Sequence, residues 1–178
     1  MKSRLGALLI LAATSLLFLA VAACNDDDED ESTAEELTLY FDDLADIQRE
    51  LSDGIEAIDE RSQAGFENPP AARQSLDGVQ TAGQSALDDV NDLEVPAAAA
   101  DAHASLSEAG EAYLAALDSL AEELQTVEAG PEYDEFLAGI DDPDSEFQQA
   151  KAGLQAACDE MQTVADDNGI VVTLECPV

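Results

Sequence analysis

The chain has 178 residues, of which 41 are Asp or Glu and six are Lys or Arg, so its formal net charge is −35 at pH 7. Such a charge argues against nucleic-acid binding, which depends on basic side chains that neutralise phosphates. It also argues against a domain that lies flat on an anionic lipid surface.

The first 23 residues have the layout of a secretory signal peptide. Lys2 and Arg4 supply a positive start, an apolar run follows over residues 5–20, and the small residues Ala22 and Ala23 precede Cys24. Directly after Cys24 the sequence changes to Asn-Asp-Asp-Asp-Glu-Asp-Glu. The change from apolar to acidic sequence therefore falls at a cysteine, where a processing site belongs.

The run Val21-Ala22-Ala23-Cys24 resembles the lipobox of bacterial lipoprotein precursors. The resemblance implies that residues 1–23 are removed and that Cys24 carries a diacylglyceryl group, often with a further acyl chain on the new amino group. Several acyl chains hold a protein firmly, because each buried methylene contributes about 0.8 kcal/mol. An uncleaved membrane-spanning helix over residues 5–23 is the less favoured alternative. Both readings place the rest of the chain on the extracytoplasmic side of the cell envelope.

Residues 24–33 are expected to form the lipidated cysteine and a disordered acidic tether, because residues 25–33 offer no apolar side chains to bury. Two interpretations of the overall acidity compete. A solvated acidic coat, as in adaptation to salt, is favoured. The alternative is weak capture of divalent cations or of a basic partner.

Residues 34–178 are predicted to form an all-α antiparallel helical bundle, because Leu and Ala recur at helical spacing between proline and glycine breaks. About four main helices and a short extra one are expected. The first begins after Ser32 or Thr33, where residues 33–36 have capping-box spacing, and ends before Asn68-Pro69-Pro70. The others cover about 71–93, 97–127, 132–140 and 144–167. Asn168-Gly169 is a helix stop, and residues 170–174 are extended in character.

Two glycines lie at similar distances on either side of the turn at Pro96. In an antiparallel pair of helices, Gly83 and Gly110 are expected to meet at nearly one level and to let the backbones approach closely.

Cys158 and Cys176 are predicted to form a disulfide, since an exported setting favours pairing. An extended chain after Gly169 is long enough to run back along the last helix to Cys158. A redox role is the alternative, but the C-x-x-C spacing typical of redox pairs is absent.

The sequence lacks the signatures of common enzymes and of cofactor or metal sites. No G-x-S-x-G turn, P-loop or G-x-G-x-x-G motif occurs, and the chain has one histidine. His103 is expected to be a partly buried structural residue; a general base or ligand group in a cleft is the alternative. The acidic run at residues 141–146 is expected to be a turn and helix start rather than a calcium site.

These observations predict a non-enzymatic, lipid-anchored envelope protein that acts as an interaction or scaffold module. Its expected partners are the membrane, through the lipid on Cys24, and another envelope protein. The alternative is an extracytoplasmic binding protein for divalent cations or a small solute. No cofactor, metal centre or nucleic acid is expected.

Overall fold

The structure, a computed structural model, describes the backbone of residues 27–61 and 68–174 and the side chains of residues 33–58 and 68–174. Its elements are α1 (Asp27–Arg61), α2 (Pro69–Asn91), the 3-10 turn η1 (Ala97–Ala99), α3 (Ala100–Thr126), α4 (Pro131–Ile140) and α5 (Glu146–Asp167). This confirms the predicted all-α bundle of four long helices and a short one. The predicted signal peptide, Cys24 and Cys176 lie outside the described residues.

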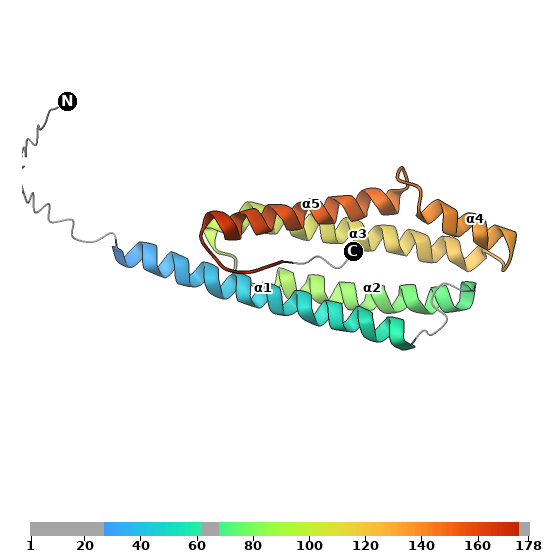
Figure 1. Cartoon of the computed structure of the whole chain (residues 1–178), viewed down its shortest axis with the longest axis horizontal. Helices are drawn as coiled ribbons and strands as arrows, with labels where there is room; N and C mark the ends of the chain where they lie inside the picture. Colours follow the sequence, from blue (N-terminus) through green and yellow to red (C-terminus); the bar gives the residue numbers. More distant parts are fainter. Residues whose placement is uncertain (1–26, 62–67, 175–178) are drawn as a thin grey trace, which may run out of the picture.

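The four long helices form an antiparallel bundle that is closed on three sides (Figure 1). Helix α1 packs on α2, α2 on α3, and α3 on α5, while the backbones of α1 and α5 come close at few points. Helix α4 folds back over the carboxyl-terminal part of α3 and leads into α5 (Figure 1). The fourth side of the bundle, between α1 and α5, is therefore its widest.

Two apolar clusters hold the bundle together. The first joins α1, α2, α3 and α5 around Phe41, Leu44 and Met161, all three of which are completely buried. The second joins α2 and α3 to α4, with Leu124 and Phe136 near its centre. Because burial of one such side chain contributes about 1.5–3 kcal/mol, these clusters supply much of the folding free energy.

Local capping decides where the later helices begin. The Asn68 side chain accepts a hydrogen bond of 3.1 Å from the Ala71 amide, and the two prolines that follow occupy the first turn of α2. Proline suits that position because the first amides of a helix have no partner within the helix. Ser145 caps α5 in the same way, through a 3.2 Å bond from the Gln148 amide.

The start of α1 differs from the prediction. The helix begins at Asp27, so the expected disordered tether is wrong for residues 27–33, and Thr33 lies inside the helix rather than at its cap. Acidic side chains are favourable in the first turns, because they complement the positive end of the helix dipole. The core residues from Leu37 onward hold the helix, and the acidic segment extends it toward the amino terminus.

The expected meeting of Gly83 and Gly110 is wrong in its register. A Cβ atom added at Gly83 would lie 2.9 Å from a methyl carbon of Leu114, and one added at Gly110 would lie 3.1 Å from a methyl carbon of Leu87. Each glycine therefore receives a leucine from the facing helix, and the two glycines lie about one turn apart. Helices α2 and α3 still approach closely at these glycines, because Leu114 packs over Gly83 and Leu87 packs over Gly110.

The chain after α5 turns back sharply and fills part of the open side. Gly169 has a φ of 70°, and the Ile170 amide donates to the Ala165 carbonyl oxygen at 2.9 Å, which together stop the helix as predicted. Ile170, Val172 and Leu174 then pack against the first cluster. The Gln162 side chain holds this tail by donating to the Val172 carbonyl oxygen and accepting from the Leu174 amide.

Candidate functional site

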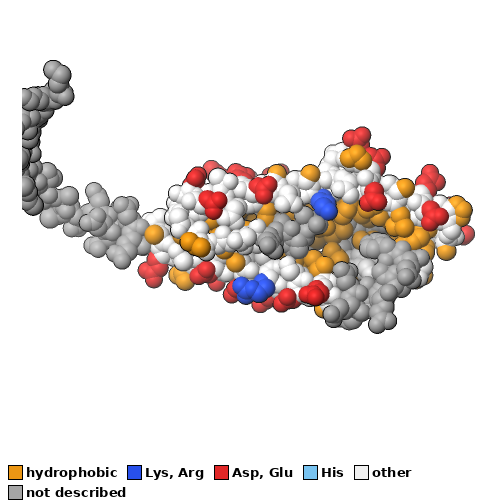
Figure 2. All heavy atoms as spheres, viewed as in Figure 1, with side chains coloured by type: hydrophobic (Ala, Val, Ile, Leu, Met, Phe, Trp, Pro, Cys, Tyr) orange, Lys and Arg blue, Asp and Glu red, His pale blue; other side chains and the backbone are white. Residues whose placement is uncertain are grey.

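The most apolar hollow in the described part of the chain is a groove on the open side of the bundle (Figure 2). Helices α1 and α5 form its walls, and α2 and α3 form its floor. Its volume is about 100 Å³, several times the ~10–15 Å³ that one water molecule requires. The lining residues are Leu44, Ile47, Gln48, Leu51, Ile55, Val79, Gly83, Ala86, Leu87, Val90, Leu106, Gly110, Tyr113, Leu114, Leu117 and Leu154.

The gap between α1 and α5 has two parts. The tail, residues 170–174, fills the part near the carboxyl end of α5, and the groove is the part that remains open. Ile170, Val172 and Leu174 pack against the cluster around Phe41 and Leu44, whereas the groove extends along α1 as far as Ile55. Leu51, Ile55 and Leu154 are consequently half-buried rather than buried. A compact bundle would bury these side chains, so their exposure marks an apolar face without a partner among the described residues.

Polar groups are scarce in the groove. Among the described residues that line it, only Gln48 and Tyr113 carry polar side chains, and none is acidic or basic. The Gln48 amide donates to Cys158 Sγ at 3.5 Å, and the Tyr113 ring packs against Phe147 with ring centres 5.7 Å apart. Burial raises the pKa of Tyr113, so its hydroxyl is neutral at pH 7. The groove thus favours an apolar occupant and offers little chemistry for catalysis.

A single lysine lies beside this groove on α5. Lys151 is one helical turn before Leu154, a wall residue, so both lie on the same face of α5. Lys151 is the only Lys or Arg in α5. The ion pair seen among the described residues joins Arg49 to Asp46 at 2.7 Å, and Lys151 has no such partner there.

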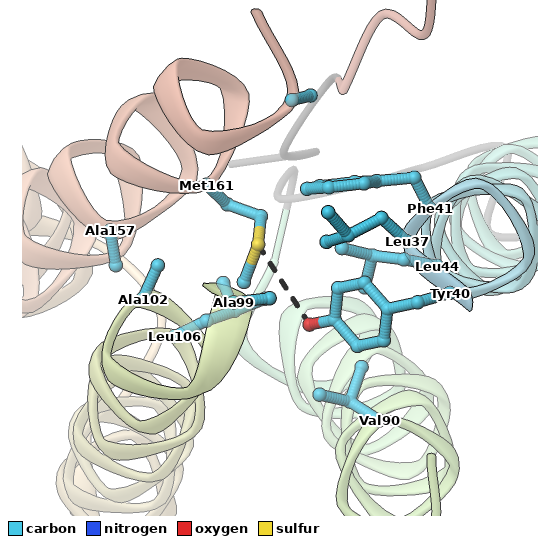
Figure 3. Close-up of a cluster of buried hydrophobic side chains, with 11 residues drawn as sticks. Leu37, Tyr40, Phe41, Leu44, Val90, Ala99, Ala102, Leu106, Ala157 and Met161 are labelled. Atoms are coloured by element: carbon cyan, nitrogen blue, oxygen red, sulfur yellow. Dashed lines mark hydrogen bonds between the residues drawn. The ribbon is translucent and has the colours of Figure 1, made fainter. Parts of the chain in front are cut away.

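His103 lies beside Tyr40 of the first cluster and is not among the described residues that line the groove. Its Nδ1 atom is 3.0 Å from the Tyr40 hydroxyl oxygen, and that hydroxyl also points at Met161 Sδ, 3.8 Å away (Figure 3). Burial lowers the pKa of His103 and raises the pKa of Tyr40 to about 12. Both groups are therefore neutral at pH 7. The contacts tie α1 to α3 and α5 and agree with the structural interpretation of His103.

The acidic run at residues 141–146 forms a turn and the start of α5. The Asp142 carboxylate accepts a 2.9 Å hydrogen bond from the Asp144 amide, and Ser145 caps the helix. Among the described residues, no group of three or more His, Cys, Asp or Glu side chains is arranged to hold a metal ion. These residues shape the turn, as the spacing predicted.

A second hollow lies between α3, α4 and the start of α5. It measures about 390 Å³ and is lined by Phe136 and Phe147. Carboxylates also line it, which makes it less apolar than the groove: Glu123, Glu132, Glu135 and Glu146. No described basic residue is among its lining.

Comparisons with protein-family models, with curated proteins and with solved structures find no match to this chain. None of the helices that the structure describes combines the length and apolarity needed to cross a bilayer.

Sequence reasoning missed the groove and the position of Lys151. Each groove residue fits the helical periodicity of a core, so the pattern alone predicts burial. The available signal was the neutral neighbourhood of Lys151, since Phe147, Gln148, Leu154 and Gln155 occupy the positions one turn away in a strongly acidic chain.

Proposed function

We propose that this chain is a non-enzymatic, lipid-anchored envelope protein that acts as an interaction module, and that it binds through the apolar groove between α1 and α5. The groove is the observation that carries the proposal. Half-buried apolar side chains gather there, on a domain whose remaining surface is rich in carboxylates. An apolar face that no described residue covers, on an acidic protein, typically marks a binding site.

The anchor is the part of the proposal that the sequence supports, through the lipobox resemblance at Cys24. We expect the mature protein to begin at Cys24 and to carry acyl chains, which mass spectrometry of the membrane-extracted protein would detect. Cys24→Ser is expected to abolish the acyl mass and release the domain from the membrane fraction. An intact, unmodified amino terminus on the wild-type protein would contradict the anchor.

Site-specific photo-crosslinking in cells tests the interaction module. A photoreactive amino acid at Leu51 lies in the groove, and one at Leu39, which is 59 % exposed on the same helix, serves as the control. We expect a discrete crosslinked product from position 51 and none of that size from position 39. The same products from both positions would show that the groove is not the interface.

An extracytoplasmic binding protein for a small solute is the second candidate. The narrowness and apolar lining of the groove favour it, because an apolar cavity takes up small apolar molecules more readily than ordered water. No contact among the described residues favours a divalent cation.

We further propose the predicted disulfide between Cys158 and Cys176. Cys158 is 3 % exposed on α5, and the tail runs back along that helix as far as Leu174, two residues before Cys176. A mass increase of two hydrogen atoms after reduction, summed over the two peptides that contain the cysteines, is expected; alkylation of both without reduction would contradict the pairing. The bond would contribute about 3 kcal/mol to stability.

A further inference from the structure

We propose that residues 176–178 continue the tail into the groove, that Val178 packs there between α1 and α5, and that the disulfide proposed above holds the segment in place. The chain then covers, with its own segment, the surface that an external partner uses. The position of the segment follows from the described tail and from the lining of the groove. Its bond to α5 and its effect on binding rest on the proposed function.

The described part of the tail runs toward the groove. After the turn at Gly169 it passes between α1 and α5 and runs antiparallel to α5 (Figure 1). The Gln162 side chain donates to the Val172 carbonyl oxygen at 3.1 Å and accepts from the Leu174 amide at 2.9 Å. These two bonds fix the level of the tail against α5. Each further residue of the tail therefore approaches Leu154, the described residue of α5 that lines the groove.

The rise of the tail and of the helix places Val178 in the groove. Two residues of an extended chain cover about 6.6 Å, and four residues of a helix cover about 6 Å. One such step from Leu174 brings Cys176 to the level of Cys158. A second step brings Val178 to the level of Leu154. One register of the tail therefore closes the disulfide and reaches the groove.

The alternation of side chains along the tail points Val178 inward. The even-numbered residues are partly buried and the odd-numbered ones are exposed: Ile170, Val172 and Leu174 against Val171 and Thr173. Successive side chains of an extended chain point to opposite sides, so Cys176 and Val178 continue the inward row and Glu175 continues the outward row. Pro177 favours an extended backbone at the residue before it, which preserves this alternation.

Cys158 lies at the mouth of the groove. Its sulfur is 3.5 Å from the side-chain nitrogen of Gln48, which is one of the lining residues. On α1, Leu51 lies three residues after Gln48, and on α5, Leu154 lies four residues before the cysteine. Because α1 and α5 run antiparallel, the two leucines lie at about one level (Figure 1). A segment bonded to Cys158 and directed along α5 consequently emerges between them.

The size and the lining of the groove suit a small apolar group. An apolar cavity of about 150 Å³ takes up a benzene molecule, so the volume of about 100 Å³ fits the smaller side chain of valine. None of the described lining residues is acidic or basic. The side chain of Val178 carries no charge, so the carboxylates on the surrounding helices do not oppose its entry. Its packing covers the half-buried Leu51 and Leu154.

The first measurement uses the purified full-length protein in detergent, without reductant, with a diazirine analogue of leucine at position 51. We expect irradiation to join position 51 to the peptide that contains residues 176–178. The same analogue at position 39, where Leu39 is exposed on α1, is expected to give no such product. Crosslinks from position 51 that never include this peptide would overturn the position of the segment.

Cys176→Ser tests what holds the segment. We expect it to lower the yield of this tail product several-fold, because the unbonded segment leaves the groove more often. Reduction of the wild type with dithiothreitol is expected to have the same effect. An undiminished yield after both treatments would overturn the role of the disulfide.

Val178→Asp places a charge at the proposed contact and leaves both cysteines unchanged. We expect it to lower the melting temperature by about 3–6 °C, since the burial of one valine is lost, and to lower the yield of the tail product. Val171→Asp is the matched control, because the same change falls on a fully exposed side chain of the same tail, and it is expected to change neither quantity. Equal effects of the two substitutions would overturn the inward position of Val178.

Crosslinking in cells tests whether the segment covers the binding surface. Cys176→Ser is expected to raise the yield of the partner product from position 51 several-fold above that of the wild type. A yield that does not rise would overturn competition between the segment and the partner. If neither protein gives a partner product while the purified chain still joins position 51 to the tail, the interaction module fails and the position of the segment stands. A partner product of equal yield from both proteins, with no tail product from the purified chain, has the opposite meaning.

Discussion

The partial burial of His103 beside Tyr40 makes the stability of the bundle depend on pH. Burial lowers the pKa of His103 below its ordinary value of about 6.5, which it regains on unfolding. Between these two values the unfolded chain binds more protons, so His103 favours folding above about pH 6.5 and loses this contribution as pH falls through the folded-state pKa. A neutral residue at 103 would remove the dependence.

We therefore predict that the melting temperature of the wild type falls, relative to that of His103→Asn, between about pH 7.5 and pH 5. Asn is chosen because its side-chain oxygen can still accept a hydrogen bond from the Tyr40 hydroxyl. Carboxylates titrate in both proteins, so the difference between the two melting curves isolates His103. Parallel curves across this range would contradict the assignment.

Gly83 offers a second test at the scale of one residue. A Cβ atom there would lie 2.9 Å from a methyl carbon of Leu114, so Gly83→Leu overpacks the contact between α2 and α3. We expect a loss of about 1–3 kcal/mol in the free energy of unfolding, measured by urea titration. Gly153→Leu on α5 is the matched control: no atom lies within 4 Å of its added Cβ, and a gain in helix propensity is expected. Equal effects at both positions would mean that the helices do not approach at Gly83.

The outcome at these residues shows how far a sequence pattern reaches. Spacing about the Pro96 turn indicated that α2 and α3 approach at glycines, but the register was wrong by one turn because the leucines of each helix occupy the gaps of the other. His103 was predicted as a partly buried structural residue, and its hydrogen-bond partner, Tyr40, lies 63 positions away in the chain. Periodicity identifies the face of a helix, whereas the partner on that face depends on how whole helices slide against each other.

At the scale of elements, Arg73 links two helices. Its Nε and one terminal nitrogen donate to the Leu124 carbonyl oxygen, at 3.1 and 2.9 Å, so α2 caps the end of α3. A helix carries partial negative charge at its carboxyl end, which a guanidinium group stabilises. Leu124 itself is completely buried, so water has little access to replace these bonds.

We predict that Arg73→Met, which keeps the apolar stem, lowers the free energy of unfolding by about 1.5–3 kcal/mol in chemical denaturation. Arg49→Met removes the same charge but breaks only an exposed pair with Asp46, so its expected effect is about 0–1 kcal/mol. If the two variants lose equal stability, the cap on α3 contributes nothing beyond net charge.

The boundaries of the elements were predictable where a local signal exists. Asn68 with its prolines, Ser145 and Gly169 act through bonds within a few residues, and the sequence shows them directly. At the start of α1 the local signal, the capping-box spacing of residues 33–36, was wrong, and the helix begins earlier, at Asp27 in the acidic segment. The groove was not predictable, because it depends on the gap that remains between α1 and α5 once the tail has packed beside one end of them.

At the scale of the whole molecule, the excess of carboxylates acts on the folded state as self-repulsion. Asp43, Asp46, Glu50, Asp89 and Asp92 gather around one hollow between α1 and α2, where Arg49 forms its single ion pair with Asp46. Folding brings these charges together, whereas the unfolded chain keeps them apart. Added salt shortens the screening length from about 30 Å at 0.01 M to about 3 Å at 1 M.

We predict that the melting temperature rises as sodium chloride increases from 0.01 M to 1 M, with most of the rise at the lower concentrations, where screening changes most. Replacing Glu50 and Asp89 by Gln and Asn removes two of the clustered charges and is expected to raise the melting temperature in dilute buffer. The same double variant is expected to match the wild type at 1 M salt, because screening has already removed the repulsion that it relieves. An equal gain in melting temperature at both salt concentrations would instead assign the effect to packing or helix propensity. A melting temperature of the wild type that does not change with salt would show that repulsion between the carboxylates does not destabilise the folded state.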